Sequence, residues 1–150
     1  MKSLFIYFSH FGNGEIVSEY LAEKNVEIRR IFREKKLPKS FFALMMKGGF
    51  LAGIKHKDKL ENYDMDVSSF DHIIIGSPIW NGRVASPINT VLKDIDLVNK
   101  KITFVFYSGS GEGKKALKRV NKEYKDAEVI FLKEPKKYKE ELAKLDSIKL

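Results

Sequence analysis

Continuous runs of apolar residues, separated by stretches with helical spacing, constrain the fold of this chain most strongly. The run at residues 70–75 holds Ile73, Ile74 and Ile75 in succession, and comparable runs recur along the sequence. Unbroken series of β-branched and aromatic residues are typical of strands buried on both faces, whereas alternating series indicate one exposed face. Strands of the first kind need a covering layer on each side. The sequence therefore predicts a sheet packed between two layers of helices.

The apolar runs alternate with candidate helices along the chain. Strands are expected at residues 2–8, 26–32, 70–75, 102–107 and 128–132, and helices at residues 14–24, 87–94, 114–125 and 136–145. Helical crossovers between successive strands are right-handed and produce a parallel sheet. The expected fold class is α/β: a doubly wound, five-stranded parallel sheet in a three-layer sandwich. With 150 residues, the chain is expected to form a single domain over residues 1–150.

A basic insert at about residues 33–63 interrupts this rhythm. It carries eight Lys or Arg residues against three acidic ones, a net charge of +5. Within it lies an apolar run at residues 40–54, where Ser40 could cap a helix and Gly48 with Gly49 should break it. The simplest interpretation is a helix whose apolar face packs on the sheet. A membrane-surface element and a dimer contact remain open, because an apolar run flanked by lysines fits both.

Composition narrows the classes of function. The chain contains no cysteine, which excludes disulfides, thiolate catalysis and Cys-ligated metals and fits a cytoplasmic location. The first 15 residues are typical of a first strand rather than a signal peptide, and no apolar stretch is long enough to span a bilayer. The three histidines are scattered, so no metal site is expected. One of them, His72, is expected at the surface where the third strand begins.

Small and polar residues connect the first expected strand to the first helix, at residues 9–15. Such a turn leaves the first helical amides without partners, and the helix dipole favours negative charge there. Gly12 and Gly14 can adopt backbone angles that let these amides converge. The segment is therefore a candidate phosphate-binding loop, although similar turns are common in proteins that bind no phosphate.

Two further loops should meet this one. In a doubly wound sheet, ligands bind beyond the carboxyl ends of the strands, where the strand order reverses. The loops at residues 76–87 and 107–113 are expected there, and both are rich in small residues, which allow a flat ligand to approach the backbone. The first of them contains Trp80, the only tryptophan, which we expect to be exposed and able to stack on a planar ring.

Each of the three loops resembles a loop of the flavodoxin family. The pattern Ser9-x-x-Gly12-Asn13 is similar to the family's phosphate loop, S-x-T-G-N-T. The sequence GSPIW at residues 76–80 is similar to the loop that holds the flavin ring, and SGSG at residues 108–111 to the loop at the ring edge. The likeness spans almost the whole chain and is greatest to short flavodoxin-like proteins. It implies the strand order 2-1-3-4-5 and FMN bound without a covalent link.

The resemblance also implies which residues bind FMN. Amides of the first loop and the Ser9 hydroxyl would hold the phosphate, Trp80 would lie against the isoalloxazine, and amides of the other two loops would bond its polar edge. The implied FMN-binding residues are Ser9, His10, Phe11, Gly12, Asn13, Gly14, Ser77, Pro78, Ile79, Trp80, Asn81, Gly82, Ser108, Gly109, Ser110 and Gly111. No catalytic acid or base is implied. Phe11 and Gly14 stand where the family has threonines, and two lost hydroxyls would weaken FMN binding roughly 10- to 1000-fold.

The function implied by the resemblance is electron transfer with FMN as the reactive centre. One alternative of the same fold is an NAD(P)H-dependent FMN or quinone reductase. The other is a flavin-free binding module that uses its basic surface. The net charge of +8 favours an anionic partner, such as an acidic redox protein. Nucleic acid is not favoured, because the chain lacks a basic platform interleaved with aromatic residues.

Overall fold

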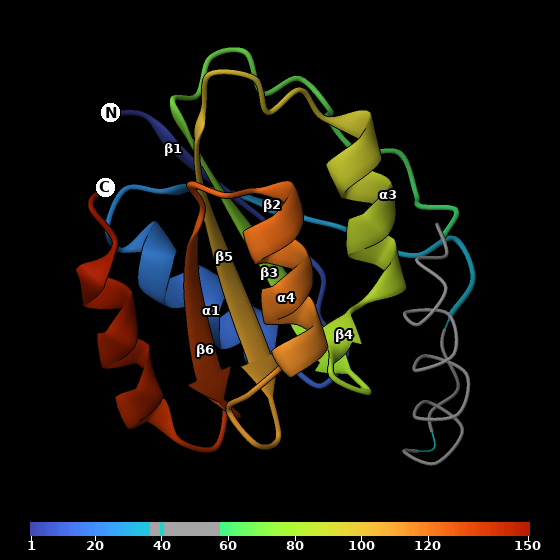
Figure 1. Cartoon of the computed structure of the whole chain (residues 1–150), viewed down its shortest axis with the longest axis vertical. Coiled ribbons are helices and arrows are strands. Elements are labelled where there is room, and N and C mark those ends of the chain that lie inside the picture. Colours follow the sequence, from blue (N-terminus) through green and yellow to red (C-terminus); the bar gives the residue numbers. More distant parts are fainter. Residues whose placement is uncertain (37–39, 41–57) are drawn as a thin grey trace.

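The computed structural model describes residues 1–36, 40 and 58–150 (Figure 1). Its elements are β1 (Ser3–Tyr7), α1 (Asn13–Ala22), β2 (Glu27–Arg30), β3 (His72–Trp80), β4 (Arg83–Val84), α3 (Ser86–Asp94), β5 (Lys101–Ser108), α4 (Lys114–Glu123), β6 (Glu128–Lys133) and the 3₁₀ helix η1 (Lys139–Ser147). The helix expected in the apolar run of the insert lies, apart from Ser40, outside the described residues.

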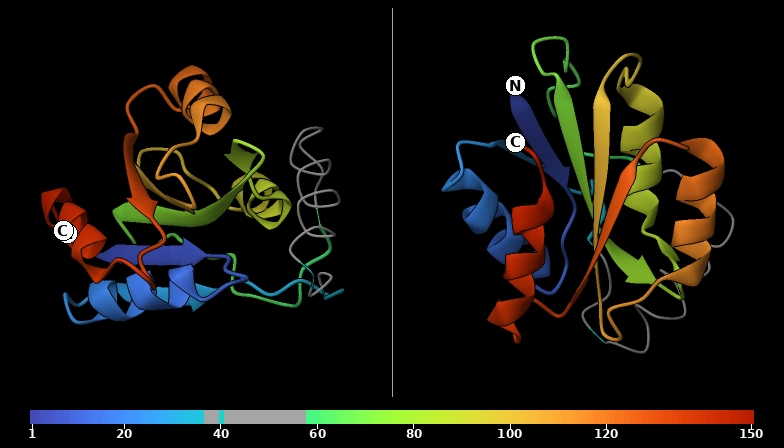
Figure 2. Two further views of the ribbon diagram at one scale, coloured as in Figure 1. Left: turned by 90° about the horizontal axis from the view of Figure 1, so that it is seen from below. Right: turned by 60° about the vertical axis from the view of Figure 1, so that its left-hand side comes forward.

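Five parallel strands form the sheet in the order β2-β1-β3-β5-β6. Counted without the short hairpin strand β4, this is the predicted order 2-1-3-4-5, and the doubly wound α/β class is confirmed. Helices α1 and η1 cover one face of the sheet, while α3 and α4 cover the other (Figure 2). The result is the expected three-layer sandwich.

Each face of the sheet has its own apolar core. On β1, Leu4 and Ile6 point to the core beneath α3 and α4, whereas Phe5 and Tyr7 point to the core beneath α1 and η1. All four side chains are buried. Burial on both faces is the physical reason why β1 shows a continuous apolar run rather than an alternating one.

The third strand is longer than the sequence predicts. The sequence places its end at residue 75, but β3 continues to Trp80, and a short turn then leads into β4. Its neighbour β1 pairs with β3 only as far as Gly76. Pro78 therefore lies beyond the end of β1 and removes no hydrogen bond from that pair of strands. What was expected to be a loop at residues 76–80 is the end of a central strand.

Two other details differ from the expectations. A helix was expected over residues 136–145, and the structure has the 3₁₀ helix η1 there, which begins three residues later and ends two residues later. His72 was expected at the surface, yet its side chain is fully buried. A 2.8 Å hydrogen bond joins its Nε2 to Thr103 Oγ1 on β5, which accounts for a polar ring inside the sheet.

The two ends of the insert are fastened together. The amide of Glu34 donates to the carbonyl of Lys59, and the amide of Glu61 donates to the carbonyl of Phe32, each at 2.9 Å. These bonds enclose a bridge between Arg33 and Leu60. The described ends of the insert therefore form a short antiparallel stem at the edge of the sheet.

Candidate functional site

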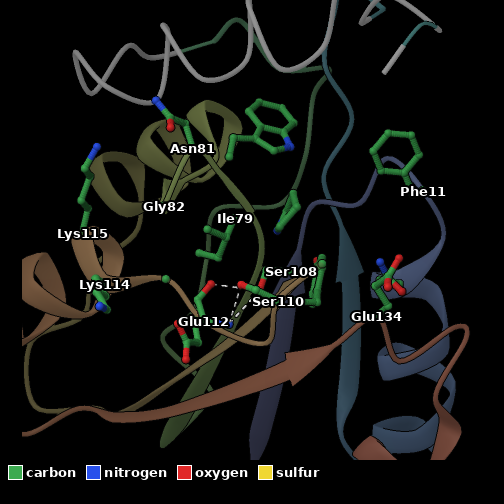
Figure 3. A pocket seen from close by; sticks show the side chains of 16 residues that line it. Phe11, Ile79, Asn81, Gly82, Ser108, Ser110, Glu112, Lys114, Lys115 and Glu134 are labelled. Carbon is green, nitrogen blue, oxygen red and sulfur yellow. Dashed lines mark hydrogen bonds between the residues drawn. The ribbon is translucent and has the colours of Figure 1, made fainter. Parts of the chain in front are cut away.

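A cavity of about 780 Å³ opens at the carboxyl ends of β1, β3 and β5 (Figure 3). The connections from β1 and β3 leave in opposite directions along the sheet, so the cavity lies where the strand order reverses. It is lined by Phe11, Asn13, Pro78, Ile79, Trp80, Asn81, Gly82, Tyr107, Ser108, Gly109, Ser110, Glu112, Gly113, Lys114, Lys115 and Glu134. All three predicted loops contribute to this list.

The first loop presents amide groups at the N-terminus of α1. Gly12 precedes the helix with a φ of 92°, a left-handed conformation that glycine adopts without strain. The amides of Gly12, Asn13 and Glu15 find no acceptor among the described residues. Unpaired amides at a helix N-terminus attract anions through hydrogen bonding and the helix dipole. This end of the cavity can therefore hold a phosphate group.

Ser9 and Gly14 shape this loop from within. The Ser9 hydroxyl, which is buried, accepts a 3.0 Å hydrogen bond from the Gly14 amide. A Cβ atom on Gly14 would lie 2.6 Å from the Tyr7 ring and 2.7 Å from Tyr107 Oη. Two tyrosines therefore fill the space that a threonine side chain would need at residue 14. The Tyr107 hydroxyl is itself fully enclosed and donates to the carbonyl of Phe8.

The second loop is a tight hairpin between β3 and β4. Asn81 and Gly82 have φ values of 50° and 76°, as a two-residue hairpin turn requires. The carbonyl of Gly82 accepts a 2.9 Å hydrogen bond from the amide of Ala116 in α4, which holds the turn against that helix. Ser77 stabilises the hairpin, because its hydroxyl accepts a hydrogen bond from the Ala85 amide and donates one to the Pro78 carbonyl.

Trp80 lines the cavity but is not the exposed ring that we expected. Only 3% of its surface is accessible, and its ring packs edge-on against Phe8 with the centroids 5.8 Å apart. Phe11, by contrast, is 47% exposed at the first loop. Trp80 is therefore a fixed wall of the cavity, whereas Phe11 is its exposed aromatic side chain.

The third loop is closed by its own serines. The Ser108 hydroxyl accepts from the Glu112 amide at 3.0 Å and donates to the Glu112 carbonyl at 2.9 Å. Ser110 accepts from the same amide at 3.2 Å. Gly111 has a φ of 76° and packs against Lys133. These bonds fix the loop that covers the β5 side of the cavity.

Ten of the sixteen predicted residues line the cavity. The other six, Ser9, His10, Gly12, Gly14, Ser77 and Gly111, lie in the same three loops without lining it. Burial and the nearby Arg33 guanidinium lower the pKa of His10, so its ring favours the neutral form. His10 therefore offers at most a neutral hydrogen bond to an anion.

Six lining residues were missed: Tyr107, Glu112, Gly113, Lys114, Lys115 and Glu134. Tyr107, Glu112 and Gly113 fall inside a loop that the sequence does single out. Lys114 and Lys115 begin helix α4, which directly follows this loop. Their position beside the cavity could therefore have been inferred from the position of the loop. Glu134 directly follows β6, and no sequence signal connects the loop after β6 to the site.

Among residues 1–36, 40 and 58–150, no cluster of His, Cys, Asp or Glu is placed to hold a metal ion.

Comparison with known proteins shows similarity of structure. No protein-family model and no curated protein matches the sequence. A candidate flavoprotein from Bacteroides eggerthii is 20% identical, with a TM-score of 0.73 over 99% of both chains. A flavoprotein in complex with FMN from Lactobacillus acidophilus is 21% identical, with a TM-score of 0.68 over 93% of this chain and 97% of that one. A candidate flavoprotein from Bacteroides uniformis is 24% identical, with a TM-score of 0.69 over 85% of each chain.

These similarities and the strand order show that the fold is flavodoxin-like. At such identities the likeness concerns the fold alone, and function has to be inferred from the site. In the described part of the chain, no helix has the length and apolar character needed to cross a membrane.

Proposed function

We propose that this protein binds FMN non-covalently in the cavity and serves in electron transfer. The observation that carries the proposal is a single cavity that joins free amides at the N-terminus of α1 to an apolar wall at the end of β3. FMN has the matching parts, a phosphate at one end and a flat ring at the other. The FMN complex of the Lactobacillus acidophilus neighbour supports the proposal.

The residues of the cavity fit the two parts of FMN. Amides of Gly12 and Asn13 would receive the phosphate, because hydrogen bonds to an ionised oxygen are about twice as strong as neutral ones. Pro78, Ile79 and Trp80 form a wall that suits a flat, largely apolar ring. The volume of about 780 Å³ falls in the range of small-molecule sites.

In this proposal the protein binds FMN, orients its ring and shields the ring from water. Bound FMN supplies one- and two-electron chemistry of its own. The Trp80 side chain is held in place by Phe8, so it would offer the flavin ring of FMN a preformed surface. The Ser108 and Ser110 bonds to Glu112 hold the covering loop in place. No described side chain is needed as a proton donor or acceptor.

A cavity-blocking variant tests this proposal. Gly109 lines the cavity, and a Cβ there would have no described atom within 4 Å apart from its chain neighbours, so Gly109→Trp should fill the site without strain. Val98 is 71% exposed in the connection between α3 and β5, at the amino end of β5 and so at the opposite end of the strands from the cavity. Val98→Trp is the matched control. Wild type and Val98→Trp should retain the flavin absorbance bands after FMN is added and the sample is desalted. Gly109→Trp should lose them.

The proposal fails if folded wild-type protein retains no FMN, or if Gly109→Trp retains as much as wild type. The first result would favour the flavin-free binding module, with the basic surface as its working part.

A reductase of the same fold is the second candidate, favoured by one observation. Lys114 and Lys115 line the cavity at the N-terminus of α4, where two ammonium groups could meet the phosphates of NAD(P)H. Stopped-flow mixing of the FMN-loaded protein with NADPH or NADH separates the candidates. Rapid bleaching of the flavin supports a reductase, and its absence supports an electron carrier.

A further inference from the structure

The loop between β6 and η1 brings a lysine to the N-terminus of α1. The amide of Lys136 donates a 3.0 Å hydrogen bond to Asn13 Oδ1, which joins the two segments. The side chain of Lys136 crosses Gly12, since a Cβ on Gly12 would lie 3.1 Å from Lys136 Nζ. The same Nζ lies 3.5 Å from the carbonyl of Phe11. A positive charge therefore stands at the phosphate-binding loop.

The ion pairs of the described residues do not include the Lys136 ammonium. Its contact with the Phe11 carbonyl is at the outer limit of a hydrogen bond, so most of its donor capacity is available. The next residue behaves differently, because the Lys137 ammonium lies over the Tyr138 ring at 5.1 Å.

We propose that Lys136 binds the phosphate of the flavin nucleotide and makes the site selective for the phosphorylated form. The inference rests on the proposed FMN function and adds to it a residue that no loop motif contains. Phe11 and Gly14 provide no hydroxyl to the phosphate, and the Lys136 ammonium takes over part of that role with a full charge. The amides of α1 and Lys136 then approach the phosphate from two different elements.

The selectivity follows from charge. A phosphate monoester carries a charge of about −1.5 to −2 at neutral pH, whereas riboflavin has no phosphate and is neutral. An ammonium group favours the first ligand and is indifferent to the second. Glu134 lines the cavity, and its carboxylate would repel an anion bound there. A positive charge at the phosphate-binding loop would counteract that repulsion. The contribution of Lys136 should therefore appear only with a phosphorylated flavin.

The test compares two ligands on three proteins. Fluorescence titrations give the Kd of FMN and of riboflavin for the wild type, Lys136→Gln and Lys137→Gln. Glutamine keeps most of the side-chain stem and leaves the Lys136 amide bond to Asn13 intact, so the loop should stay in place. Lys136→Gln should weaken FMN binding between roughly fivefold and fiftyfold. Riboflavin binding should change less than twofold, and Lys137→Gln should leave both ligands unaffected.

Different failures have different meanings. If the wild type binds neither flavin, the FMN function fails and this inference fails with it. If the wild type binds FMN and Lys136→Gln binds it equally well, only the inference fails. It also fails if Lys136→Gln weakens riboflavin as much as FMN, since the lysine would then shape the loop rather than contact a phosphate. Equal losses in Lys136→Gln and Lys137→Gln would assign the effect to net charge.

Discussion

At the scale of single residues, packing decides how the phosphate-binding loop is built. A Cβ on Gly14 would lie 2.6 Å from the Tyr7 ring and 2.7 Å from the Tyr107 hydroxyl oxygen, too close for a side chain to fit. The missing threonine hydroxyl at this position is therefore a consequence of two large residues beneath the loop. A threonine at residue 14 could not restore a phosphate donor while both tyrosines remain.

The variant Gly14→Ala should destabilise the protein by about 1–3 kcal/mol, because the added methyl overpacks a buried site. Its matched control is Gly109→Ala, where the new methyl meets no described atom within 4 Å apart from its chain neighbours; that change should stay within about 0.5 kcal/mol. Urea unfolding measures both free energies. Equal values for the two variants would contradict the crowding at Gly14.

His72 gives the stability a dependence on pH. Burial, with a smaller effect of the nearby Lys101 charge, lowers the pKa of His72 from 6.5 to about 4. The folded state thus favours the neutral ring, while the unfolded chain takes up a proton near pH 6.5. The stability from this group is complete above about pH 6.5 and is lost as the pH falls toward 4.

Between pH 7 and pH 5 the wild type should lose about 2 kcal/mol of unfolding free energy through His72. The variant His72→Gln should lose that much less over the same interval. His10→Gln is the comparison, since the pKa of the half-buried His10 is lowered in the same direction but less than that of His72. This variant should keep most of the wild-type pH dependence. The assignment to His72 is wrong if urea unfolding shows the same pH dependence in His72→Gln as in wild type.

At the scale of elements, one buried carboxylate connects the insert to α3. Asp58 is 7% exposed and contacts Arg33 Nε at 2.7 Å, and it accepts a 2.8 Å hydrogen bond from the Ser86 hydroxyl. Thr90 Oγ1 donates to the Asp58 carbonyl at 2.7 Å. The stem at residues 33–34 and 59–61 is therefore held to the first two turns of α3.

Replacing Asp58 by Ala should cost about 3–5 kcal/mol, since it leaves a buried guanidinium without its partner. Glu61→Ala removes an exposed carboxylate from the same stem and should cost less than about 0.5 kcal/mol. The midpoints of urea unfolding provide the comparison. Similar midpoints for the two variants would show that Asp58 does not fasten the insert to α3.

The sequence predicted the elements whose signal is local. The apolar runs predicted the five parallel strands, and the resemblance to flavodoxins implied their order. The end of β3 was misread because Gly76 and Pro78 resemble strand breakers, while their effect depends on where β1 stops pairing. The burial of Trp80 depends on Phe8, which directly follows β1 and is distant from Trp80 in the sequence. The approach of Lys136 to Gly12 depends on tertiary contacts between distant segments, and no local pattern contains it.

At the scale of the whole molecule, positive charge gathers beside the cavity. The chain carries a net charge of +8. Helix α4 holds Lys114, Lys115, Lys118, Arg119 and Lys122 against one acidic residue, Glu123. Its first two lysines line the cavity. We therefore expect an acidic redox partner to approach the proposed flavin from the α4 side, attracted by this field.

Small oxidants test that field without a known partner. Oxidation of the reduced, FMN-loaded protein by anionic ferricyanide should slow between roughly 0.01 and 0.15 M salt, where the Debye length falls from about 30 to about 8 Å. Oxidation by cationic hexaamminecobalt should accelerate over the same range. Lys114→Gln/Lys115→Gln should slow ferricyanide more than Lys122→Gln/Lys125→Gln, although both pairs remove the same charge. The second pair lies at and just beyond the far end of α4. Equal slowing would therefore show that the overall charge, and not the charge beside the cavity, steers the oxidant.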